Sequence, residues 1–211
     1  MRLKGKQALI TGSSRGIGQG IALKLAQEGA TIAVHYYRNH EAAADTLARI
    51  REIGSDGIII QADVSVVDDI RRMCAEVRDT FGTLDIFVSH ARSELATPFQ
   101  VALGEVTPLM PNGGRILAIT FAHSPAKAAL ETSVRGFAVA LAARGITVNA
   151  LNPGLTADSA LNAGNVVALL CSDDASRITG QVIAADSGAS LINPPLSIQM
   201  QLAQSAAEMT S

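Results

Sequence analysis

The chain has 211 residues, of which 48% are hydrophobic, enough for one domain with a substantial core and too few for two. Its 17 basic and 19 acidic residues nearly balance, which argues against nucleic acid or an anionic membrane as a partner. No apolar run is long enough for a membrane span or a signal-peptide core, so we expect a cytoplasmic protein. We expect one domain over residues 1–190 and a polar C-terminal tail over 191–211.

Short aliphatic runs alternate with longer helical patterns along the chain. We expect strands at 7–11, 31–36, 57–61, 85–89, 115–120, 146–151 and 181–185, and helices at 16–28, 40–53, 66–81, 124–143 and 164–171. This alternation predicts βαβ units and a mostly parallel sheet. The fold class is therefore α/β, a Rossmann-type doubly wound sheet of about seven strands with helices on both faces.

Two further patterns concern the surface and the core. In the helix at 124–143, Lys127, Glu131 and Arg135 form one narrow polar stripe, so this helix is expected to be buried on two sides. One side faces the sheet, and the other faces either a neighbouring subunit or a covering loop.

Cys74 and Cys171 lie in apolar helical patterns without metal-type spacing, which predicts buried, reduced thiols and no metal site.

A glycine-rich turn follows the first strand directly. Residues 11–18 read TGSSRGIG and lead into an apolar helix, with Gly12, Gly16 and Gly18 allowing the backbone to approach a pyrophosphate. A turn of this composition between a first strand and a helix predicts a dinucleotide site.

The end of the second strand bears on the choice of dinucleotide. It reads VHYYRNH and has no carboxylate before Glu41 to bind a ribose diol, whereas Arg15 and Arg38 are suited to a 2′-phosphate. NADP(H) is therefore expected rather than NAD(H). The alternative is that both arginines are solvated surface residues.

These motifs continue through QADVS at 61–65, DIFVSHA at 85–91, GGRILAIT at 113–120, VNALNPG at 148–154 and DDASRITGQVIAADSG at 173–188. From residue 6 to residue 188 the sequence thus resembles the short-chain dehydrogenase/reductase family, most closely its 3-oxoacyl-carrier-protein reductases. The resemblance implies a set of NADP(H) contacts: Gly12, Ser14, Arg15, Gly16, Ile17 and Gly18 at the phosphates, Asp63 and Val64 at the adenine, and Ala91, Lys127, Pro153 and Gly154 toward the nicotinamide.

The family's catalytic group is mostly absent. The family uses a Tyr as general acid/base, a Lys that lowers its pKa, a Ser that binds the substrate oxygen and an Asn. Only Lys127 remains, while His123 occupies the Tyr position and Phe121 the Ser position. The central helix that carries the Asn is largely lost from 93–112, and Arg92 replaces a glycine beside the cofactor, where it either obstructs the nicotinamide or points outward.

Pocket segments are also short, since only Ala122 joins the serine strand to the next helix and the substrate lid shrinks to 155–164. Pro125 favours the first helical position, which places His123 outside the helix, away from Lys127. The pair is interpreted as vestigial.

Three functions are compared. The leading hypothesis is a non-catalytic subunit that assembles with an active paralogue, as a hetero-oligomer. The resemblance implies that this paralogue acts on a 3-oxoacyl or 3-hydroxyacyl thioester held by a carrier protein, in a biosynthetic route such as an antibiotic pathway. The alternatives are an active homo-oligomeric oxidoreductase that uses His123, Lys127 and Thr120, and a non-enzymatic NADP(H)-binding module.

Overall fold

A computed structural model describes residues 1–91, 97–120, 125–154 and 159–188 of the chain. Its seven strands form one parallel sheet in the order β3-β2-β1-β4-β5-β6-β7. The strands are β1 (Gln7–Ile10), β2 (Thr31–Tyr36), β3 (Gly57–Gln61), β4 (Ile86–Ser89), β5 (Arg115–Ile119), β6 (Thr147–Asn152) and β7 (Val182–Ala184). The predicted doubly wound α/β fold is confirmed.

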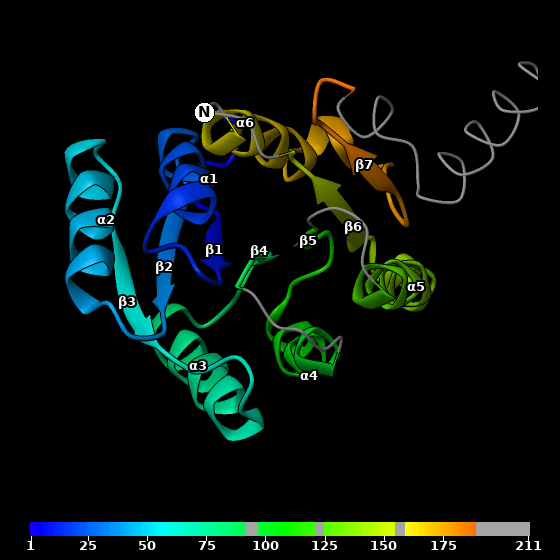
Figure 1. Ribbon diagram of the computed structural model, residues 1–211, viewed down its shortest axis with the longest axis horizontal. Helices are drawn as coiled ribbons and strands as arrows, with labels where there is room; N and C mark the ends of the chain where they lie inside the picture. The colour runs from blue at the N-terminus through cyan, green and yellow to red at the C-terminus, as the bar shows by residue number, and fades with distance from the viewer. Residues whose placement is uncertain (92–96, 121–124, 155–158, 189–211) are drawn as a thin grey trace, which may run out of the picture.

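Helices cover both faces of this sheet (Figure 1). One layer holds α1 (Gly16–Gln27), α2 (His40–Glu52) and α6 (Ser159–Leu170), and the other holds α3 (Val67–Phe81), α4 (Thr97–Val106) and α5 (Pro125–Leu141). Each layer buries its own apolar cluster against the sheet, which explains why strands such as Ala8–Ile10 are apolar on both faces.

Two helices differ from the prediction. The 93–112 interval, from which the central helix was expected to be largely lost, contains α4, a helix of ten residues. Its apolar residues Phe99, Leu103 and Val106 recur at helical spacing and are buried in the cluster that includes α3. In the other layer α6 begins at Ser159, five residues before the predicted start at residue 164.

The early start of α6 is explained by close packing on α1. A Cβ atom added to Gly20 of α1 would lie 2.6 Å from the carbonyl oxygen of Ala160. A Cβ atom added to Gly164 would likewise lie 2.9 Å from the carbonyl oxygen of Gly20. The two helices approach this closely because both glycines lack a side chain, so the first turn of α6 is stabilised by tertiary contact.

The two cysteines are buried, as predicted. Burial raises the pKa of the Cys74 thiol, and also of the Cys171 thiol, to about 12, so both remain protonated and unreactive at neutral pH. Within the described residues, no group of side chains could hold a metal ion. None of the described helices is long and apolar enough to cross a membrane.

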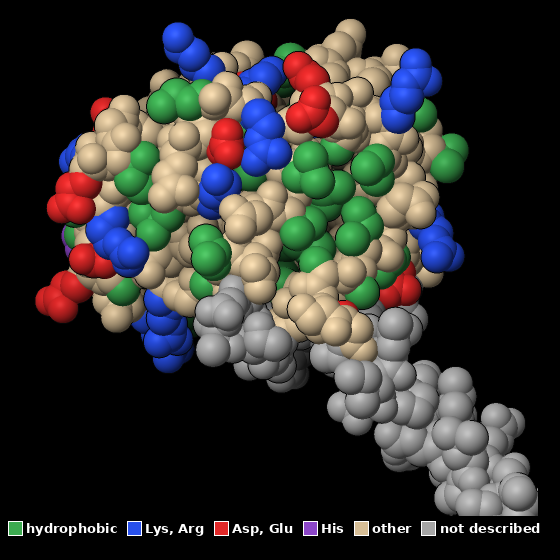
Figure 2. Space-filling view, turned by 90° about the horizontal axis from the view of Figure 1, so that it is seen from above, with side chains coloured by type: hydrophobic (Ala, Val, Ile, Leu, Met, Phe, Trp, Pro, Cys, Tyr) green, Lys and Arg blue, Asp and Glu red, His purple; other side chains and the backbone are tan. Residues whose placement is uncertain are grey.

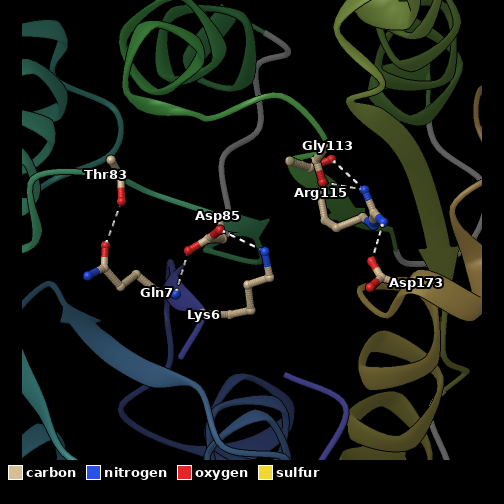
Figure 3. Close-up of polar contacts among 8 residues, drawn as sticks. Lys6, Gln7, Thr83, Asp85, Gly113, Arg115 and Asp173 are labelled. Atoms are coloured by element: carbon tan, nitrogen blue, oxygen red, sulfur yellow. Dashed lines mark hydrogen bonds and ion pairs between the residues drawn. The ribbon is translucent and has the colours of Figure 1, made fainter. Parts of the chain in front are cut away.

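Polar contacts fasten the amino ends of the strands (Figure 3). The Asp85 carboxylate accepts hydrogen bonds from Lys6 Nζ at 3.0 Å and from the Gln7 amide at 2.9 Å, which joins β1 to β4. Buried Arg115 donates to the carbonyl of Gly113 and lies 3.3 Å from the carboxylate of Asp173. Ion pairs therefore hold the amino ends of the strands together, and the loops of the candidate site follow the carboxyl ends.

Replacing Gly20 with Ala should destabilise the protein by about 1–3 kcal/mol, because the new methyl group forces α1 and α6 apart. Gly136→Ala in α5 is the matched control, since nothing lies within 4 Å of its added Cβ atom. The control should be neutral or stabilise by up to about 1 kcal/mol. Urea unfolding followed by circular dichroism measures both, and equal effects would contradict the packing argument.

Candidate functional site

The loop after β1 lies at the point where the strand order reverses. Strands β2 and β3 continue from β1 in one direction and β4 begins the other, so loops leave the β1/β4 carboxyl ends toward opposite sides. The Thr11 hydroxyl accepts hydrogen bonds from the amides of His90, at 2.9 Å, and Ala91, at 3.0 Å. The predicted dinucleotide loop is thereby fixed against the segment that follows β4.

Glycine is needed at each of the three glycine positions of this loop for a different structural reason. Gly12 has φ +71°, and a Cβ atom there would lie 3.1 Å from the Cα atom of Ala91. A Cβ atom on Gly18 would overlap the carbonyl oxygen of Gly12. Gly16 has φ +59° and faces open space, since nothing lies within 4 Å of an added Cβ atom. The loop is therefore closed toward the protein and open at Gly16, where a ligand can approach the backbone.

The first turn of α1 is suited to an anion. Arg15 precedes the helix, and no side chain caps it or contributes a carboxylate to its first turn. The free amides of this turn and the positive end of the helix dipole favour a phosphate group. Ser14 and Ile17 are partly buried and the Arg15 side chain is exposed, so the loop residues fit the predicted pyrophosphate contacts.

Four side chains meet at the carboxyl ends of β2 and β3. The guanidinium of Arg38 lies 4.6 Å from the centroid of the Tyr37 ring and donates to the Tyr37 hydroxyl at 3.1 Å. That hydroxyl bonds in turn to the Asp63 carboxylate, which also accepts the Ser65 hydroxyl at 2.6 Å. The Ser65 contacts, with smaller contributions from Tyr37 and Arg38, lower the pKa of Asp63.

This cluster places Arg38 and Asp63 together, as both the adenine and the 2′-phosphate predictions require. Val64 is next in sequence and partly buried. No carboxylate follows β2 in this cluster, because Tyr37 and Arg38 occupy the positions directly after the strand. Sequence reasoning missed Tyr37, which holds the guanidinium by a cation–π contact and a hydrogen bond.

Two buried polar residues behind the loop were also missed. The imidazole of His35 in β2 accepts the Gly12 amide at 2.8 Å. The hydroxyl of Thr46, which is fully buried in α2, accepts Gln19 at 2.8 Å. Its single proton is shared between the Ser14 carbonyl at 3.1 Å and the Ala42 carbonyl at 3.0 Å. The available signal was a polar residue among apolar neighbours, in TIAVHY and on the inner face of α2.

The nicotinamide side is only partly described. Ala91 is partly buried, Pro153 is buried, and Gly154 has φ +70° with its amide donating to Asn152 Oδ1 at 3.2 Å. A Cβ atom on Gly154 would lie 2.8 Å from the Cβ atom of Asp186, so this turn also requires a residue without a side chain. Arg92 lies outside the described residues.

Of the predicted catalytic positions, some lie within the described residues and others do not. His123, Phe121 and Ala122 lie outside the described residues, and Lys127 is placed only as the third residue of α5 (Pro125–Leu141). Thr120 is 3% exposed, and its hydroxyl donates to the Leu151 carbonyl at 3.4 Å. This hydroxyl therefore has a hydrogen-bond partner within the sheet.

Acid should weaken the fold through two histidines. Burial lowers the pKa of His35, and that of His90, to about 4, whereas an unfolded histidine titrates near 6.5. Between pH 7 and 5 the unfolded state binds protons that the folded state does not, so the free energy of unfolding should fall by about 2 kcal/mol for each histidine. Urea titrations at both pH values measure this, and His35→Asn should reduce the loss. Unfolding independent of pH in this window would contradict it.

Comparison with known proteins agrees with this geometry. The family model for short chain dehydrogenase matches residues 6–104, and that for Enoyl-(Acyl carrier protein) reductase matches residues 93–165. The chain is 32% identical to 1-cyclohexenylcarbonyl-CoA reductase of Streptomyces collinus, over 89% of this chain and 88% of the relative. That alignment extends over 246 positions, more than this chain contains, so the relative has segments without a counterpart here.

A second relative is the 3-oxoacyl-[acyl-carrier-protein] reductase FabG of Staphylococcus aureus, 31% identical over 87% of this chain and 97% of its own length. Among solved structures, the landomycin C-6 ketoreductase LanV with bound NADP and rabelomycin is similar, with a TM-score of 0.81 and 30% identity over 90% of this chain and 98% of that one. By its sequence, its fold and its glycine loop, the chain belongs to the short-chain dehydrogenase/reductase family of oxidoreductases.

Proposed function

We propose that the chain is an NADP(H)-binding subunit that does not catalyse reduction by itself and assembles with an active ketoreductase of the same family. The observation that carries this proposal is the contrast between two halves of the site. The phosphate loop keeps its backbone geometry, whereas the Thr120 hydroxyl donates to Leu151 and the next residue in the sequence is Phe121.

The chemistry explains why this contrast matters. Hydride transfer from NADPH to a ketone leaves negative charge on oxygen, which must be stabilised and protonated. A missing donor to that oxygen costs about 10²–10³ in rate, and a missing general acid costs about 10²–10⁴, although such effects do not simply add. A chain without the family's Ser and Tyr is therefore expected to turn over very slowly.

The cofactor assignment rests on the loop and on the cluster at Tyr37. The α1 amides would hold the pyrophosphate, Asp63 the adenine, and Arg15 with Arg38 a 2′-phosphate. The bound NADP of LanV supports the same class of dinucleotide. Lys127 would contact the nicotinamide ribose from the first turn of α5.

The substrate would be bound by the partner. The names of the two relatives specify acyl groups on coenzyme A and on acyl carrier protein, which are both thioesters. A 3-oxoacyl or 3-hydroxyacyl thioester is therefore the substrate class that we propose for the assembled enzyme, within a biosynthetic pathway.

The outer face of α5 supports assembly with a partner. Ala129, Thr132, Gly136 and Ala140 are exposed there, and Val139 is 80% exposed. Small side chains of this kind let the backbone of another helix approach closely.

Apolar side chains also gather on the face that α6 covers, where Leu161 is 62% exposed (Figure 2).

An active oxidoreductase is the second candidate. It is favoured by one observation, since Lys127, which matches the family's lysine in sequence, is retained on α5. His123 would then act as the acid. In that case His123→Ala and Lys127→Ala would each lower turnover of the purified chain, and unchanged kinetics in both variants would reject this candidate.

Cofactor binding can be tested with Arg38. The wild-type chain should bind NADPH more tightly than NADH, and Arg38→Ala should weaken NADPH binding by about tenfold or more, because a charge-assisted hydrogen bond contributes about 1.5–3 kcal/mol. NADH binding should change little. Fluorescence titration measures all four affinities, with Arg78→Ala on α3 as the control. Equal affinity for both dinucleotides would contradict the role of Arg38.

Assembly can be tested by gentle purification from the native host. We expect an equimolar complex with a family member that has the Ser, Tyr and Lys, and no turnover of a 3-oxoacyl thioester by this chain alone. Val139→Glu should release the partner, whereas Val67→Glu, at an exposed position on α3, should not. Recovery of an active homo-oligomer would overturn the proposal and favour the His123 alternative.

A further inference from the structure

His35 is a buried polar residue in a strand whose other inward residues are apolar. Its side chain contacts the loop directly at Gly12, and the residue is 2% exposed. Its backbone amide donates to the Ser13 hydroxyl at 3.0 Å, and its carbonyl accepts the Ser13 amide at 3.1 Å. Strand β2 is thus bonded to the loop one residue beyond the last β1–β2 pair, Ile10 with Val34.

Both ring nitrogens of His35 are engaged. Nδ1 lies 2.8 Å from the Gly12 amide nitrogen, and Nε2 lies 3.1 Å from the Ala62 carbonyl oxygen. The Gly12 amide can only donate and the Ala62 carbonyl can only accept. The neutral imidazole with its proton on Nε2 is therefore the one form that satisfies both contacts.

The two contacts join separate parts of the dinucleotide site. Gly12 belongs to the phosphate loop, and Ala62 directly precedes Asp63 at the adenine end. Gly12 is also packed closely on Ala91, whose Cα atom would lie 3.1 Å from an added Cβ atom. The partly buried Gly12 amide would lose its hydrogen-bond partner if the imidazole were removed.

We propose that His35 is a positioning residue for the dinucleotide, which holds the phosphate loop at Gly12 in register with the Ala62–Asp63 segment. The inference rests on the proposed binding of NADP(H). The loop is then formed before the cofactor arrives, so binding does not have to order it. Burial, which lowers the pKa of this imidazole, keeps it in the neutral form that the two bonds need.

Three variants separate the two bonds. Asn at position 35 has its amide oxygen at the same number of bonds from the backbone as Nδ1, so His35→Asn retains an acceptor for Gly12. His35→Gln retains a donor for Ala62 but not the Gly12 acceptor, and His35→Phe removes both. His40→Asn is the control, because His40 is exposed and is the first residue of α2.

NADPH affinity is the first readout. The dissociation constants of His35→Gln and His35→Phe should rise at least about fivefold over wild type, that of His35→Asn, which loses only the Ala62 bond, should rise less, and that of the control should stay within about twofold. Circular dichroism confirms that each variant is folded at the temperature used. Equal affinity in all folded variants would overturn the role of His35.

Amide hydrogen exchange without cofactor is the second readout. The Gly12 amide should be protected in wild type and in His35→Asn, and should exchange at least about tenfold faster in His35→Gln and His35→Phe. If wild type fails to bind NADPH, the proposed function fails, and this exchange pattern still decides whether His35 holds the loop.

Nitrogen-15 NMR of the wild-type imidazole decides the case in which the Gln and Phe variants do not fold. A neutral ring with its proton on Nε2 at pH 7 supports the proposal. A ring with its proton on Nδ1, or a charged ring, would overturn it.

Discussion

The contact between the end of β1 and the segment after β4 is the constraint on which the site depends. Thr11 accepts two amides from that segment, and Gly12 has a positive φ of +71° and lies so close to Ala91 that an added Cβ atom would be only 3.1 Å from its Cα atom. Because β1 and β4 are neighbours at the reversal of strand order, this contact fixes where the loop turns and where α1 begins. The free amides of α1 are directed by the same turn.

The contacts at the amino ends of the strands hold the sheet together, whereas those at the carboxyl ends hold the loop of the dinucleotide site. At the amino edge, Asp85 joins β1 to β4 and Arg115 anchors the start of β5. At the carboxyl edge, the hydrogen bonds instead hold backbone groups of a loop, through His35 and Thr46. A loop held from behind by buried side chains keeps its front amides available for an anion.

The substrate half contrasts with this preserved loop. The Thr120 hydroxyl is bonded within the sheet, and α6 begins at Ser159, within the stretch where the family resemblance placed a shortened lid. The Gly20 contact brings α6 against α1 over the same stretch. A chain of this kind keeps the scaffold and the cofactor loop, and this is the physical basis for proposing that its chemistry depends on a partner.

Within the described residues, the sequence by itself determined the seven strands, five of the six helices and the glycine loop, because apolar periodicity and glycine spacing are local properties. It also predicted Arg38 as a dinucleotide contact from the missing carboxylate after the second strand, and Asp63 through the family resemblance. It did not predict α4, the early start of α6, or the roles of His35, Tyr37 and Thr46. Only the tertiary structure decided these, because each depends on a partner that is distant in the chain: α3 for α4, Gly20 for α6, Gly12 for His35, Asp63 for Tyr37 and Ser14 for Thr46.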